Sequence, residues 1–335
     1  MKNKKGMMAL LAITLMLGLV FTGCGAFTEV SKVSGYLSLA QRVGRSQRGG
    51  PVPLAVKVNL NENWGNLLGA INAAGVPVNL DLSGCTMTNT EFNPGSNGSA
   101  HIVSLVLPND VTGITGDFSA FTSLRSVSLP ASVVLEANPF LGLSDLTFVV
   151  RGRGDLGTIE RGRALVYGGN ELVSYPAANG SITLNNITAV GRGAFADTEM
   201  WSIDLPSATS IGDAAFYGAV NLQAINIPAV VNIGNNIAAN TGGTELTITV
   251  GSSLESIGTG MFTEITVRKN VIVKAPESAV ESITAMREGF RGRGWNEGAF
   301  RLAAQRTTTT GSGWWAQTTT VNNFNTNINL TVEGY

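Results

Sequence analysis

The sequence predicts a mainly β protein whose central part is a solenoid of short, stacked strands. Isoleucines alternate with polar residues around Ile203, Ile225 and Ile248, at spacings of 22 and 23 residues. An Ile-Gly pair recurs between these strands, at Ile211 and Ile233. Glycine accounts for 41 of the 335 residues, about 12% against a usual ~7%, which indicates many tight turns.

The composition excludes several classes of function. Lys and Arg total 22 against 23 Asp and Glu, so the net charge of −1 offers no electrostatic basis for binding nucleic acid. One histidine and two cysteines argue against a His/Cys metal centre or a disulfide framework. The segment Asn59–Gly65 hints at a calcium loop, but it lacks aspartates and has Ala70 where a glutamate belongs. No Gly-x-Ser-x-Gly motif accompanies His101. We therefore expect a non-enzymatic protein with no catalytic residues, no metal, no cofactor and no nucleic-acid partner.

Residues 1–23 are predicted to be a lipoprotein signal peptide. Three lysines precede the apolar run Met7–Val20, which is too short to span a ~30 Å hydrocarbon layer comfortably. The run ends in Phe21-Thr-Gly-Cys24, which resembles the lipobox of bacterial lipoproteins, although Phe21 stands where leucine is preferred. The resemblance implies export, lipidation of Cys24, and an anchor in the outer membrane at the cell surface. An ordinary secretory signal with an incidental Cys24, or an uncleaved anchor, are the alternatives.

Residues 24–53 are expected to form a tether, and residues 54–100 an N-terminal cap. The first segment is weakly patterned and rich in Gly and Pro at its end. In the second, alternation from Leu54, an apolar helical face before Gly75 and a further alternating run predict a strand–helix–strand unit. Such a unit would cover the first coil of a solenoid. Cys85 is interpreted as a buried residue in a turn, because no basic neighbour is present to activate its thiol.

The repeated unit cannot fold alone. In Ile225-Asn-Ile227 the apolar side chains share one face, which predicts a short half-buried strand that Pro228 ends. The following Ala-Phe phrase, as at Phe216, places a bulky side chain beneath the coil. Roughly five large apolar groups per unit contribute ~1.5–3 kcal/mol each. Ordering the unit's residues costs ~1–2 kcal/mol of backbone entropy apiece, which is more in total. Stacking must supply the missing burial, so Ile203, Ile225 and Ile248 should occupy adjacent rungs.

These phrases resemble the BspA-type leucine-rich repeat surface proteins of bacteria. The family repeat, L-x-x-I-x-L-P-x-x-V-x-x-I-G-x-x-A-F, is matched by Leu222–Pro228 followed by Ile233-Gly234. The segment 164–177, with its Gly-Gly-Asn turn and Tyr175-Pro176, resembles the family's inserted hairpin. The resemblance implies a leucine-rich repeat solenoid with short parallel strands, an inserted β-hairpin, and small α/β capping regions at both ends.

The resemblance also divides the chain. It implies a first repeat block at 101–150, an inserted hairpin at 151–183 and a second repeat block at 184–267. In the second block the superposed strand segments begin at Trp201, Leu222 and Leu246. We expect an irregular coil where Ile237-Ala238 replaces Ala-Phe.

Residues 268–335 are expected to be a C-terminal cap or a small separate module. Pro276–Phe290 has a helical pattern, and the alternation at 326–332 predicts a final strand. Three tryptophans gather here: Trp295, Trp314 and Trp315. They either pack in the core of this region or form an exposed platform that stacks on sugars.

By resemblance, the solenoid mediates protein–protein interaction or adhesion, with extracellular host proteins or other bacteria as partners. The flat, low-charge face formed by outward strand positions suits such contact. These positions are Ser104, Val106, Ser126, Ser128, Ser202, Asp204, Ala224, Asn226, Thr247 and Thr249. Two alternatives remain, a glycan-binding surface protein that uses the C-terminal tryptophans and a structural envelope protein.

Overall fold

The computed structural model describes residues 26–44, 50–262 and 269–286, together with the backbone of three strands at 301–308, 315–322 and 328–334. The chain divides into two compact units. The N-terminal unit comprises Met1–Val133 and Val149–Arg153, and the C-terminal unit comprises Val134–Phe148 and Gly154–Tyr335.

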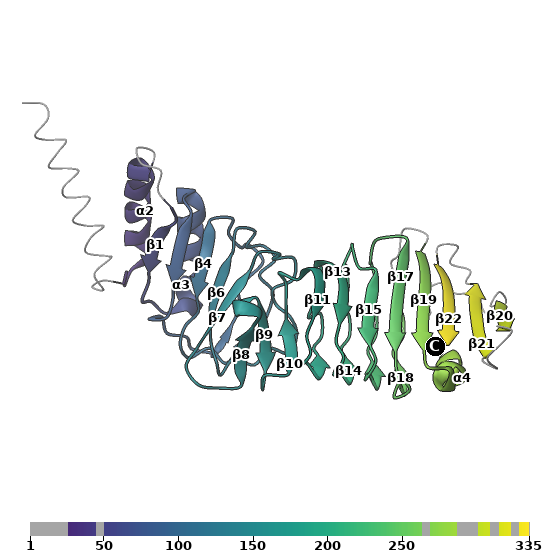
Figure 1. Cartoon of the computed structure of the whole chain (residues 1–335). Coiled ribbons are helices and arrows are strands. Elements are labelled where there is room, and N and C mark those ends of the chain that lie inside the picture. Colours follow the sequence, from purple (N-terminus) through teal and green to yellow (C-terminus); the bar gives the residue numbers. More distant parts are fainter. Residues whose placement is uncertain are drawn as a thin grey trace, which may run out of the picture. The chain divides into compact units, whose positions relative to one another are not determined.

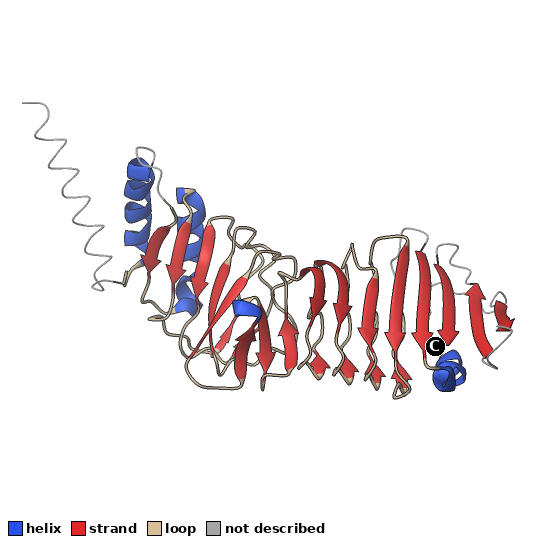
Figure 2. Cartoon of the chain, in the orientation of Figure 1, coloured by secondary structure: helices blue, strands red, loops and turns tan. Residues whose placement is uncertain are grey.

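The N-terminal unit combines helices with a sheet of order β1-β2-β4-β6-β7 (Figures 1 and 2). Its helices are α2 (Val30–Gly44) and α3 (Leu60–Ala74). The sheet contains β1 (Val52–Ala55), β2 (Val78–Asp81), β4 (Ile102–Val106), β6 (Ser126–Pro130) and β7 (Thr147–Arg151), of which 149–151 belong to this unit. A small parallel pair joins β3 (Glu91–Phe92) to β5 (Gly113–Ile114).

The strand–helix–strand order expected after residue 54 is present as β1, α3 and β2. Asn59 caps α3 by accepting a hydrogen bond from the Asn61 amide at 3.0 Å. Gly75 ends the helix in the left-handed region, at a φ of 63°. The buried face of α3 carries Leu67 and Ile71, so the helix covers the sheet through its apolar side.

The structure differs from the expected tether at residues 30–44, which form α2. Val33 and Leu37 lie four residues apart, on one helical face, and both are fully buried. Tyr36 donates a hydrogen bond to the carbonyl of Pro53 at 3.1 Å, and its ring contacts Phe27. These contacts order a segment that has no strong sequence pattern of its own.

The C-terminal unit is a solenoid built from two sheets (Figure 1). The first has the order β11-β13-β15-β17-β19-β22-β21-β20, and the second β18-β16-β14-β12-β10-β9-β8. The strands of the first sheet are β11 (Asn179–Thr183), β13 (Glu199–Asp204), β15 (Ala224–Ile227), β17 (Glu245–Val250), β19 (Lys269–Ala275), β20 (Arg301–Thr308), β21 (Trp315–Asn322) and β22 (Ile328–Gly334). Those of the second are β8 (Leu156–Ile159), β9 (Ala164–Tyr167), β10 (Glu171–Ser174), β12 (Ala189–Val190), β14 (Ser210–Ile211), β16 (Asn232–Ile233) and β18 (Ser256–Ile257).

The predicted rungs are confirmed. Ile203 pairs with Ile225, and Ile225 pairs with Ile248, in parallel register. The ladder continues to Val273 on β19. All four side chains are at least 99% buried and belong to one continuous apolar core. The fold is therefore the stacked solenoid that the spacing predicts.

The Ala-Phe phrases also stack inside the solenoid. The rings of Phe195 and Phe216 lie 5.6 Å apart and are nearly parallel, at 19°. In the register of these coils Ala238 follows Phe216 and Ile237 follows Ala215; both are fully buried, and the Ile237 carbonyl accepts the Phe216 amide at 2.8 Å. The prediction of an irregular coil there is wrong, because the backbone keeps its regular form: the Ala238 amide donates to the Met261 carbonyl at 3.1 Å, and Asn236 repeats the positive φ of Gly193 and Ala214.

The hairpin within 151–183 is present. β9 and β10 pair antiparallel, and β8 adds a third antiparallel strand. The 3-10 helix η1 (Glu160–Gly162) joins β8 to β9. Tyr175 is buried, with the Arg163 guanidinium 5.6 Å from its ring centre, a cation–π contact that fixes the end of the hairpin.

The described part of the C-terminal region begins as expected, with short helices after Pro276. They are η2 (Glu277–Ala279) and α4 (Val280–Ala285). The final strand, β22, extends the first sheet beside β19. Within the described residues, every helix is too short or too polar to cross a bilayer.

Candidate functional site

The outward side of the first sheet brings together six of the predicted binding residues. They form two rows across neighbouring coils, which we call the strand face: Ser202, Ala224 and Thr247 in one row, and Asp204, Asn226 and Thr249 in the other. All six are partly exposed. Because parallel strands lie about 4.8 Å apart, the rows present evenly spaced small side chains on a rigid support.

A side-chain hydrogen bond orders the second row. The Asn226 amide nitrogen donates to the Asp204 carboxylate at 2.7 Å. The row continues in register to Lys274 on β19. The face therefore carries few charges, and both signs occur along one row.

The sequence reasoning missed Trp201, which is 58% exposed. Gly180 pairs with Met200, whereas the next residue, Ser181, pairs with Ser202. Trp201 is the extra residue of this β-bulge, and bulges re-aim side chains in this way. It therefore points outward, although Leu222 and Leu246, with which the sequence aligned it, are buried.

A signal for this arrangement exists in the sequence. Met200 stands three residues before Ile203, as Leu222 stands three residues before Ile225. Met200 and Leu222 are both fully buried. Alignment on these two residues would have placed Trp201 at an outward position.

In the N-terminal unit, the predicted residues pair as expected but are not equally available. Ser104 pairs with Ser126, and Val106 pairs with Ser128. Ser104, Val106 and Ser126 are partly exposed. Ser128 is only 7% exposed, so its predicted solvent-facing position is wrong.

The side chain of Arg151 crosses this part of the sheet. It lies on β7, and its guanidinium donates to the Leu107 carbonyl and to Asn109, beyond β4. β6 stands between β4 and β7 in the sheet, and the Ala131 amide that follows β6 donates to the Arg151 carbonyl at 2.7 Å, so the Arg151 side chain crosses β6 near Pro130. Burial also lowers the pKa of Arg151.

The remaining predicted sites fall outside what the structure describes, apart from Cys85. Cys24, Trp295 and Trp314 lie outside the described residues, and only the backbone of Trp315 is described, at the start of β21. Cys85 is buried, as predicted, and its thiol donates to the Val56 carbonyl at 3.2 Å. Burial raises the pKa of the Cys85 thiol, which keeps it protonated and unreactive.

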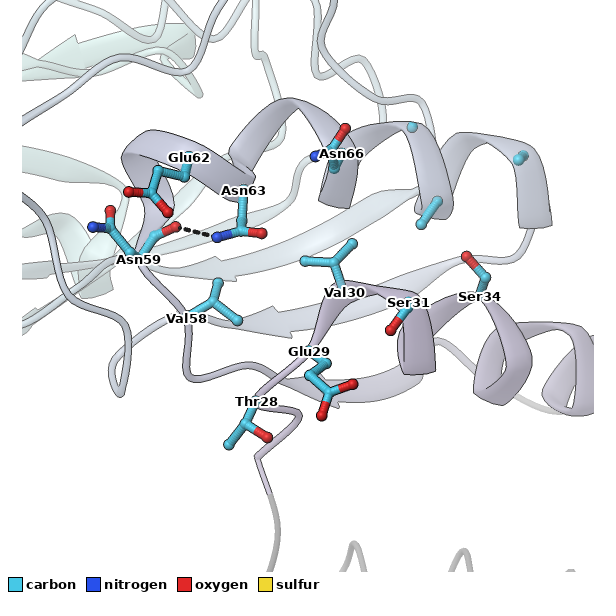
Figure 3. A pocket seen from close by; sticks show the side chains of 13 residues that line it. Thr28, Glu29, Val30, Ser31, Ser34, Val58, Asn59, Glu62, Asn63 and Asn66 are labelled. Carbon is cyan, nitrogen blue, oxygen red and sulfur yellow. Dashed lines mark hydrogen bonds between the residues drawn. The ribbon is translucent and has the colours of Figure 1, made fainter.

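A cavity of about 830 Å³ lies between the two helices of the N-terminal unit (Figure 3). Ser31 and Ser34 line it from α2, and Glu62 and Asn66 line it from α3. Its lining contains no aromatic side chain. In the described part of the chain, His, Cys, Asp and Glu side chains do not gather in groups of three or more that suit a metal ion.

The comparison with protein families agrees with this geometry. Residues 181–285 match the BspA type Leucine rich repeat region, in six copies. This part of the chain is a BspA-type leucine-rich repeat region. Its repeats contain the strand face and the bulge at Trp201. In the N-terminal unit, Ser104 pairs with Ser126, which shows the same spacing of 22 residues between neighbouring coils.

Two solved structures are similar to the chain. One is a leucine rich cell surface protein from Faecalibacterium prausnitzii, at 18% identity and a TM-score of 0.40, with 70% of this chain and 73% of that chain covered. The other is the pneumococcal vaccine antigen PcpA, at 13% identity and a TM-score of 0.17, with 62% and 82% covered. The search of curated proteins found no match.

Proposed function

We propose that this chain is a non-enzymatic, lipid-anchored surface protein whose BspA-type repeat region binds another protein through the strand face. The observation that carries the proposal is the pair of continuous, partly exposed rows of small, mostly polar side chains on a rigid sheet. A repeated, low-charge surface of this kind favours broad contact over the enclosed chemistry that catalysis needs.

Trp201 supplies the anchor that such a face needs. Flat interfaces gain most of their affinity from a few large side chains, among which tryptophan is prominent. Trp201 immediately precedes Ser202 of the strand face, and its carbonyl accepts the Gln223 amide of the next coil at 2.8 Å. The backbone that presents the indole is therefore held by the solenoid, which lowers the entropy cost of binding.

Replacement of Trp201 by alanine is expected to weaken partner binding by roughly thirtyfold, corresponding to the ~2 kcal/mol of an anchor residue. A Thr247→Arg change on the strand face should have a similar effect, because it adds a bulky charge to one of the two rows. The matched control is Ser256→Arg, since Ser256 is exposed on the second sheet. Proteins retained from extracellular matrix, or from other bacteria, by the wild type and each variant would be quantified by mass spectrometry.

Proteins lost with both strand-face variants and kept by Ser256→Arg would support the proposal. Equal retention by all four chains would move the binding site elsewhere. Unchanged thermal unfolding of the variants would show that the loss does not come from misfolding.

The lipid anchor is tested through the two cysteines. Two or more acyl chains give lasting membrane attachment, since each buried CH₂ contributes ~0.8 kcal/mol. Cys24→Ser should abolish processing before residue 24 and move the protein from the detergent phase to the aqueous phase in detergent partitioning. Cys85→Ser is the control and should stay in the detergent phase. Identical partitioning and processing of Cys24→Ser and wild type would contradict lipidation.

A further inference from the structure

A second cavity of the N-terminal unit, about 280 Å³, has the features of a ligand site. It lies beside the start of α3 and the strand β3. Its lining combines an aromatic ring and a thioether, Trp64 and Met87, with four polar side chains from Asn61, Asn89, Glu91 and Asn93. Asn61 and Trp64 belong to the Asn-rich segment 59–65.

The apolar part of this cavity is held in place. Trp64 Nε1 donates to the Pro94 carbonyl at 3.0 Å. Its ring meets buried Phe92 edge-on at 5.3 Å, and the ring of Phe121 lies parallel to it at 6.4 Å. Trp64 and Met87 are themselves half-buried. The exposed part of the indole is therefore a rigid apolar surface inside a polar rim.

The asparagine side chains of the rim use their oxygens within the protein, which leaves their NH₂ groups as donors. The Oδ1 atom of each asparagine accepts a hydrogen bond from a backbone amide. Asn61 accepts from Thr88 at 2.6 Å. Asn89 accepts from Glu91 at 2.5 Å, and Asn93 accepts from Gly95 at 2.8 Å. The three Nδ2 groups make no hydrogen bond to any described residue. They remain as donors, and the exposed Glu91 carboxylate is an acceptor beside them.

This set of groups selects one class of ligand. An anion is disfavoured, because the lining contains no lysine or arginine and does contain Glu91. A simple cation would leave the three amide donors without an acceptor. A hydroxyl group both donates and accepts, and so satisfies the amides and the carboxylate together.

We propose that this cavity binds one sugar ring of a neutral glycan. The hydroxyls of the ring would meet the asparagine and glutamate groups, while its C–H face would pack against Trp64 and Met87. The volume of about 280 Å³ lies just below the ~300–1,000 Å³ of drug-sized sites, which fits one ring with the remainder of the glycan outside. Binding of a single ring should be weak, on the order of a millimolar Kd. The site belongs to the N-terminal unit and does not depend on the strand face.

The test is an NMR titration of the full chain with neutral monosaccharides and their oligosaccharides. Asn89→Asp and Asn93→Asp keep the oxygen that each turn uses but replace the NH₂ donor with an acceptor. Each should weaken sugar binding about tenfold, corresponding to one lost donor and an unpaired acceptor. Asn170→Asp, in the exposed turn of the β9–β10 hairpin, is the control for the added charge and should bind as wild type does.

Three results would overturn the proposal. These are no binding by any sugar of the panel, equal binding by all three aspartate variants, or saturation by sulfate or tetramethylammonium in place of sugar. Thr247→Arg should leave sugar binding unchanged. Failure of this proposal is therefore distinguishable from failure of the strand face to bind protein.

Discussion

Replacement of Gly234 by alanine is expected to destabilise the repeat region by about 1–3 kcal/mol or more, although it adds only a methyl group. A Cβ at Gly234 would lie 2.6 Å from the Asp213 nitrogen and 2.8 Å from the Gly212 carbonyl carbon. Both are backbone atoms of the preceding coil, so neither can move without separating the coils. Urea unfolding, with hydrogen exchange over residues 210–260, would measure the loss.

The control substitution, Gly65→Ala, is expected to change stability in the opposite direction. Gly65 lies inside α3, and a Cβ there would meet nothing within 4 Å. Gly65→Ala should stabilise the N-terminal unit by about 0.5–1 kcal/mol, because alanine loses less backbone entropy in a helix. If both variants changed stability in the same direction, the close approach of the coils would not be the reason for glycine at position 234.

Truncation of Ile225 to alanine should cost about 2–5 kcal/mol, the usual range for a large side chain removed from a core. Ile225 is 1% exposed and lies between Ile203 and Ile248 on adjacent rungs. The cavity would open inside a stack that cannot collapse, since the flanking coils are held by backbone pairing. The midpoint of urea unfolding and the protection of β13 and β17 amides would report the effect.

Gln223→Ala is the matched control for Ile225→Ala. Gln223 is exposed, two residues earlier on the same coil, and its backbone amide keeps its bond to Trp201 in either variant. Its replacement should change stability by no more than about 0.5 kcal/mol. A loss from Gln223→Ala equal to that from Ile225→Ala would contradict the assignment of inward and outward positions.

The reason for the glycine in the repeated Ile-Gly pair could not be predicted from the sequence. Its recurrence predicts a turn, and each such glycine does lie just after a strand of the second sheet. The need for glycine at these positions, however, does not come from the turn. Cβ atoms at Gly212, Gly234 and Gly258 would each approach backbone atoms of the preceding coil to 2.9 Å or less. The stacking distance therefore requires glycine, and no single coil contains that information.

The exposure of two other residues could not be predicted from the sequence either. Trp201 faces outward because of a bulge between β11 and β13, and its placement depends on the register of two strands. Ser128 is buried although the alternation along β6 places it on the outward side. Both outcomes depend on the strands beside the residue and not on the alternation of its own strand.

The sequence by itself determined the repeat length, the strands, the inward isoleucines and the solenoid that joins them, because alternation and spacing are local properties that each unit carries. Only the tertiary structure decided which outward residues are accessible, why the phrase glycines are needed, and that Asn61, Asn89 and Asn93 share one cavity with Trp64. The physical reason is that exposure and close approach arise between coils. They exist only once the coils have stacked.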